Sequence, residues 1–203
     1  YRLLFKSIAT TNSISLADQT GLFSTALLPT VEYVSLMQQC KKVVLEAHES
    51  FQKQTNRSRF HILSPNGIQT LQIPLVHAKE QHQPVTEAEI SYQSSWQIQH
   101  WRSIETAYNR SPFFEFYKDE LKDVYFKKEK LLFNYNLNLL QWILKILNIN
   151  IEISYTDIYE REFLNGYDFR KLSNSKNNSI GYSEFFNPAR YQQVFEQSIL
   201  KLQ

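Results

Sequence analysis

Residues 23–47 read FSTALLPTVEYVSLMQQCKKVVLEA. The beginning of this stretch predicts a short strand that stops at Pro29, and its β-rich end predicts a second strand over 42–47. Between them, Thr30 is a candidate helix N-cap, and apolar residues at helical spacing follow it as far as Cys40. Strand, short helix and strand in this order are typical of a βαβ unit, so the two strands are expected to lie parallel.

Downstream of this unit the sequence predicts a β-hairpin. Two β-prone runs, 59–63 and 70–76, flank Ser-Pro-Asn-Gly at 64–67, and Asn-Gly is a strong turn signal because both residues tolerate positive φ. The other predicted elements are helices at about 96–110, 112–127, 129–147 and 191–202, brief strands at 89–92 and 150–154, and a long loop over 165–183. The predicted fold class is therefore α/β, a partly parallel sheet with a β-hairpin insertion and a helical segment packed on the sheet.

The domain organisation follows from these elements and from the composition. We expect a single domain over 21–203, preceded by an N-terminal arm or edge extension over 1–20. A chain of 203 residues that is 42% hydrophobic and 21% charged has ordinary globular composition, which excludes collagen-like, disordered and coiled-coil classes. The formal net charge of +2 is too small to indicate a nucleic-acid partner.

Features that the sequence lacks indicate the cellular location of the protein and its cofactor requirement. Cys40 is the only cysteine, so no internal disulfide can form, which fits a reducing compartment. No signal-peptide pattern is visible at 1–20, and the apolar stretch 131–147 carries a polar stripe that a membrane span would not tolerate. We therefore expect a cytoplasmic protein with no membrane span. The sequence has no His-x-x-x-His pair, CxxC, Walker loop or GxGxxG, so no metal or cofactor is expected.

The first candidate site is the stretch 48–59, HESFQKQTNRSR. It follows the second strand of the βαβ unit, and open α/β sheets bind ligands beyond the carboxyl ends of their strands. Its cations and amides suit an anionic group. The candidates are His48 as a catalytic base and Gln52, Lys53, Asn56, Arg57 and Arg59 as substrate-binding residues. The alternative is a solvated loop before the hairpin.

His100 is the second catalytic candidate. It lies within the apolar stripe of the helix predicted at 96–110, so it either bonds both ring nitrogens in the core or lines a pocket. Further substrate-binding candidates, on this helix and in the later loop, are Trp101, Arg102, Tyr108, Asp168 and Arg170. Arg57 has no acidic neighbour after Glu49, and His100 is hard to explain on an apolar face. We therefore predict that the two share one pocket.

Several short motifs follow one another along the chain. They are Leu28-Pro29 before Tyr33, QKQTNR at 52–57, Asn66-Gly67 before LQIP at 71–74, WQIQHWR at 96–102, Ala107-Tyr108 and SPFF at 111–114. In this order they resemble the WbqC-like family, over about residues 22–200. Members of that family are often encoded with surface-polysaccharide genes, and a glycine-transferase role has been suggested for some. The resemblance thus implies a role in polysaccharide assembly.

Two functional classes result. The first is a transferase of surface-polysaccharide (O-antigen-type) biosynthesis that moves an activated aminoacyl or acyl group to a sugar. Its substrate would be a small anionic or sugar-linked molecule. Arg57 with Lys53 or Arg59 would hold the anionic part of the donor, and His48 or His100 would take a proton from the attacking amine or hydroxyl. The alternative is a non-catalytic binding or assembly protein of the same pathway. The enzyme needs an imidazole and a guanidinium facing one concave site.

Overall fold

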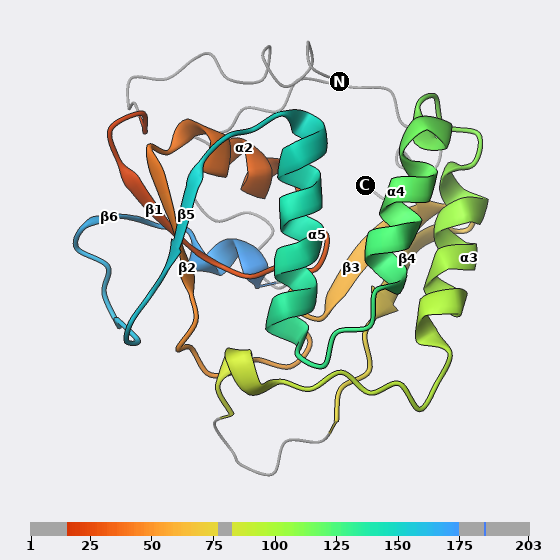
Figure 1. Ribbon diagram of the computed structural model, residues 1–203, viewed down its shortest axis with the longest axis horizontal. Helices are drawn as coiled ribbons and strands as arrows, with labels where there is room; N and C mark the ends of the chain where they lie inside the picture. The colour runs from red at the N-terminus through yellow and green to blue at the C-terminus, as the bar shows by residue number, and fades with distance from the viewer. Residues whose placement is uncertain (1–15, 77–82, 175–184, 186–203) are drawn as a thin grey trace.

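The computed structural model describes residues 16–76, 83–174 and 185 (Figure 1). Most of the expected N-terminal arm and the helix expected at 191–202 lie outside this part of the chain. Within it, a parallel four-stranded sheet, an antiparallel two-stranded hairpin and four α-helices form one α/β domain. The predicted fold class is confirmed. Leu16, inside the expected arm, is buried in the core.

The βαβ unit forms as predicted. Strand β1 (Thr20–Ser24), helix α2 (Val31–Gln39) and strand β2 (Lys42–Glu46) follow one another, and β1 pairs in parallel with β2. The Thr30 hydroxyl accepts a hydrogen bond from the Tyr33 N–H at 3.3 Å and so caps α2. Strand β1 ends earlier than predicted because its paired register with β2 stops at Ser24 and Glu46.

The sheet order is β5-β2-β1-β6. Strand β5 (Glu152–Tyr155) pairs with β2, close to the strand predicted there, and β6 (Gly166–Asp168) pairs with β1. The short helix η2 (Arg170–Ser173) follows. The prediction of one long loop over 165–183 is therefore wrong for its first part. A strand of three residues is too short to show a hydrophobic alternation.

Within the described residues, the hairpin is followed in the chain by four helices before β5, one of them a short 3₁₀ helix. Strands β3 (Arg59–Ser64) and β4 (Gly67–Gln72) pair in antiparallel fashion. The following helices are η1 (Val85–Glu87), α3 (Trp96–Tyr108), α4 (Phe114–Phe126) and α5 (Leu132–Leu147). The strand predicted at 89–92 is reduced to isolated bridges, among them one between Leu75 and Ile90.

Helix α5 stands between the four-stranded sheet and the group formed by the hairpin, α3 and α4 (Figure 1). On one side Leu132, Tyr135 and Leu139 belong to a core cluster with residues of β3, β4 and α3. On the other side Leu140 and Leu144 pack in a second cluster with β1, β2 and α2. One helix therefore supplies both cores, and the two halves of the molecule meet along it.

Gly166 lies where β6 approaches β1 most closely. A Cβ at this position would overlap the carbonyl oxygen of Thr20, a backbone atom that cannot rotate away. We expect Gly166→Ala to lower the free energy of unfolding by about 1–3 kcal/mol, because β6 must shift outward. Urea denaturation followed by circular dichroism measures this. The control is Lys171→Ala, an exposed change on η2 that should cost less than about 0.5 kcal/mol. Equal costs for the two variants would contradict the close approach.

Candidate functional site

The carboxyl edge of the parallel sheet holds most of the predicted site residues. The chain places β2 and then β5 on one side of β1, and returns to place β6 on the other side. The carboxyl ends of β1 and β6 therefore form a topological switch point, where open α/β sheets commonly bind ligands. Ser24 and Asp168 end these two strands.

Arg57 is buried at this edge and is fully engaged. Its guanidinium binds both carboxylate oxygens of Glu49, with Nε–Oε1 at 2.8 Å and Nη2–Oε2 at 2.7 Å. It also donates to the Ser24 hydroxyl at 2.9 Å and to the Asn174 side chain at 3.0 Å. Its acidic partner is thus Glu49, the residue after which the sequence offers no further acidic neighbour. Arg57 is 1% exposed and Glu49 is 6% exposed. Through the contacts with Ser24 and Asn174, this bidentate pair connects the segment after β2 with the end of β1 and with the residue that follows η2.

Arg170 forms a second buried network beside the first. It contacts Asp168 through Nε and Nη2, the shortest distance being 2.6 Å, and it donates from Nη1 to Glu46 at 3.2 Å. Two backbone carbonyls, of Glu160 and Arg161, accept its remaining N–H groups. The Asp168 carboxylate beside it raises the pKa of Arg170. Asp168 and Arg170 thus bind each other, and the Arg170 guanidinium is engaged within the protein.

His100 is a core residue. Its Nδ1 lies 2.7 Å from the Tyr125 hydroxyl, and its ring meets Trp96 edge to face. Burial lowers the pKa of His100 to about 4, although a hydrogen bond with the backbone of Gln72 acts in the opposite direction. The ring is therefore neutral near pH 7. Of the two alternatives that the sequence left open, core packing is the one that these contacts describe.

The remaining predicted residues are distributed over several surfaces. His48 is exposed just after β2, and its backbone N–H donates to Glu46 Oε1 at 2.8 Å. Trp101 is buried in the first core cluster. The others lie as follows: Gln52, Lys53 and Arg102 are exposed, Asn56 and Arg59 are half-buried, and Tyr108 lines a groove described next.

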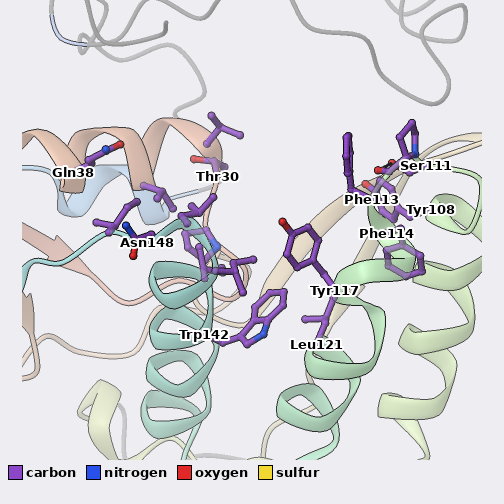
Figure 2. Close-up of a pocket in the computed structure, with 18 residues that line it drawn as sticks. Thr30, Gln38, Tyr108, Ser111, Phe113, Phe114, Tyr117, Leu121, Trp142 and Asn148 are labelled. Carbon is purple, nitrogen blue, oxygen red and sulfur yellow. Dashed lines mark hydrogen bonds between the residues drawn. The ribbon is translucent and has the colours of Figure 1, made fainter. Parts of the chain in front are cut away.

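A groove of about 940 Å³ separates the two halves of the molecule (Figure 2). One wall is made by α2 with the end of α5, and the other by the turn between α3 and α4. Tyr117 from α4 and Trp142 from α5 project into the space between them, as Figure 2 shows. The other aromatic residues of the lining are Tyr108, Phe113 and Phe114.

The described polar side chains that line this groove are uncharged. Its polar side chains besides those of Tyr108, Tyr117 and Trp142 are Thr30, Gln38, Ser111 and Asn148, and none of the described residues that line it is charged. The indole N–H of Trp142 is buried and has no hydrogen-bond partner among the described residues. A volume of this size with aromatic walls and a few hydroxyl and amide groups is typical of a site for a small organic molecule. Neither His100 nor Arg57 lines it.

Comparison with known proteins was made for the whole chain. The model of the WbqC-like protein family matches residues 25–197. The chain belongs to the WbqC-like family. No match was found among curated proteins or among solved structures. Family membership confirms the resemblance that the motifs indicated, and it names neither a substrate nor a reaction.

Two further properties of this WbqC-like chain concern metal binding and membrane-spanning helices. In the described residues no group of three or more His, Cys, Asp or Glu side chains is placed to hold a metal ion. No helix in the same part of the chain is long and apolar enough to cross a membrane.

Several residues and contacts at the site of this WbqC-like chain were not predicted from the sequence. Glu49 as the partner of Arg57 could have been inferred, since it lies at the start of the same polar stretch. Glu46 and Arg170 are distant in sequence and meet only because β6 returns beside β1. Trp142 lies in the helix predicted over 129–147, and no local signal places its indole opposite Tyr117 across the groove.

Proposed function

We propose that the groove holds the sugar part of a sugar-linked substrate. On this proposal the chain is a transferase of surface-polysaccharide biosynthesis that moves an activated aminoacyl or acyl group to that sugar. The observation that carries the proposal is that aromatic rings, among them those of Tyr117 and Trp142, line the apolar groove together with uncharged hydroxyl and amide groups. A sugar ring has an apolar C–H face that packs on an aromatic ring, and hydroxyl groups at its edge that need hydrogen-bond partners.

The details of the lining support a neutral polyhydroxyl ligand. Tyr117 and Trp142 project toward the groove from opposite walls. A free anion would find no cation in the lining. The polysaccharide context comes from family membership, and the groove adds the kind of surface that a sugar would use.

The transfer step requires a base. The sugar amine or hydroxyl would attack the carbonyl carbon of the donor, the bond from that carbon to the leaving group would break, and the proton of the nucleophile would pass to an imidazole. Of the two proposed histidines, His48 is exposed whereas His100 is enclosed by Trp96 and Tyr125. His48 is therefore the base that this proposal retains; it does not line the groove, so the proposal requires that the nucleophile of the bound sugar extend beyond the groove to His48.

A second candidate is a binding or assembly protein of the same pathway without catalysis. The observation that favours it is the position of the histidines: His48, His61 and His100, the three in the described residues, do not line the groove. Both candidates bind a sugar there, and they differ in turnover. Incubation with acyl and aminoacyl thioesters and the bound sugar, followed by mass spectrometry of the sugar, distinguishes them.

Binding in the groove is tested with the intrinsic tryptophan fluorescence of the protein, to which Trp142 contributes, and a panel of neutral mono- and oligosaccharides. We expect saturable binding that Tyr117→Ala weakens about tenfold or more, since loss of one stacked ring costs about 1–3 kcal/mol. The matched control is Phe116→Ala. Phe116 directly precedes Tyr117 on α4, is 77% exposed and does not line the groove. Equal weakening by both variants, or no saturable binding of any sugar, would contradict the proposal.

A further inference from the structure

A second, smaller cavity lies on the hairpin side of the molecule. It has a volume of about 250 Å³ and is formed by the residues that follow β2, the end of β4 and the segment around η1. It shares no lining residue with the aromatic groove. Its polar side chains are Lys53, Gln54, Ser58, Gln72 and Gln83, and its apolar floor includes Leu75 and Ala88.

Lys53 differs from the lysines that form ion pairs elsewhere in the molecule. Lys118 and Lys130, for example, lie 2.8 Å and 3.0 Å from glutamate oxygens. Among the described residues, Lys53 forms no salt bridge, and none of the residues that line the cavity there is acidic. Glu49, the carboxylate at the start of the same segment, is bound to Arg57. The ammonium group is therefore available to an external anion.

The segment that carries Lys53 is held in an unusual backbone conformation. Gln54 has a φ of 59°, in the left-handed region that residues other than glycine seldom adopt. Such conformations cost free energy and occur preferentially at ligand sites. The turn is anchored nearby, where the Thr55 hydroxyl donates to the Gln52 carbonyl at 2.9 Å and Arg57 is fixed by Glu49. The buried ion pair thus orders the segment from which Lys53 and Gln54 line the cavity.

We propose that this cavity binds a small anion that carries a carboxylate or a phosphate group. The Lys53 ammonium supplies the charge, and the Gln72 amide, with the Gln83 N–H that is not used by the Glu87 carbonyl, supplies further donors. A volume of 250 Å³ is below the roughly 300–1,000 Å³ of pockets for drug-sized ligands, so the occupant is small. The site is independent of the sugar groove, and either can exist without the other.

The test is a titration of the ¹⁵N-labelled protein with inorganic phosphate and, separately, with acetate, at constant ionic strength in chloride. We expect saturable shifts of the backbone amides of Lys53, Gln54 and Gln72 with at least one anion. Saturation by phosphate alone identifies a phosphate site, and saturation by acetate alone identifies a carboxylate site. No saturable shift with either anion would overturn the proposal.

Variants distinguish a specific anion site from a general attraction of anions to surface lysines. Lys53→Met keeps the length of the side chain and removes its charge, and it should raise the dissociation constant at least tenfold. Lys41→Met, an equally exposed change on the turn before β2, should leave the constant within twofold. Gln83→Glu should also weaken binding at least tenfold, because it places a carboxylate in the lining. If Lys53→Met and Lys41→Met weaken binding equally, the site is refuted.

Discussion

Glu49→Gln is expected to lower the free energy of unfolding by about 3–5 kcal/mol. The substitution removes the negative partner of Arg57, whose guanidinium is 1% exposed, and leaves a buried charge without compensation. The Ser24 hydroxyl, which donates to Glu49 Oε2 at 2.9 Å, also loses a charged acceptor. Urea denaturation at pH 7, with the slope of the transition compared between variants, measures the effect.

The control for this prediction is an ion pair on the surface. Glu120→Gln removes the partner of Lys145, and the two side chains are 57% and 74% exposed. Its expected cost is below about 1 kcal/mol, because water solvates both charges and screens their attraction. The double variant Glu49→Gln with Arg57→Met should recover part of the loss, since it removes the uncompensated cation. A loss of less than about 1 kcal/mol for Glu49→Gln would show that the pair is dispensable.

The second large effect is a loss of stability in acid that comes from His100. Its pKa is about 4 in the folded protein, below the ordinary value of 6.5, because burial disfavours the charged ring. The unfolded chain therefore takes up this proton at higher pH than the folded chain. The contribution of His100 is fully present above pH 6.5 and is lost as the pH falls toward 4, by about 3 kcal/mol in total.

Two measurements check this behaviour. In the folded protein the His100 ring signals should keep the chemical shift of neutral imidazole down to pH 5 in an NMR titration. In urea denaturation between pH 7 and 5, the wild type should lose more stability than His100→Asn, in which the titrating ring is absent. A ring that titrates with a midpoint near 6.5 would mean that His100 is solvated, and would reopen its assignment as a catalytic base.

The fold was predictable where its signals are local. Thr30 as an N-cap and Asn66-Gly67 in a hairpin turn are decided by residues within a few positions of one another, and both are confirmed. The parallel pairing of β1 and β2 was predicted from the order strand, short helix, strand, and it is confirmed. Strand β6 was missed because it exists only through its pairing with β1, which no pattern within 166–168 reveals.

The candidate site was less predictable, because it depends on where side chains point. The sequence shows that Arg57 and Lys53 are cations of one polar stretch, but it does not show that Arg57 turns inward to Glu49 while Lys53 stays exposed. His100 was recognised on an apolar face, and its partner Tyr125 belongs to another helix. In the aromatic groove only Tyr108 was among the predicted site residues, since the walls come from segments far apart in the chain.

The position of α5 between two cores has a consequence for how the molecule opens. Unfolding either cluster would remove half of the packing that holds this helix, through Tyr135 and Leu139 on one side or Leu140 and Leu144 on the other. Neither half can therefore open far without loosening the other, and the chain is coupled into one cooperative unit. Amide hydrogens along α5 would exchange with solvent only in the rare global opening. The groove thus keeps its two walls in register for as long as the molecule is folded.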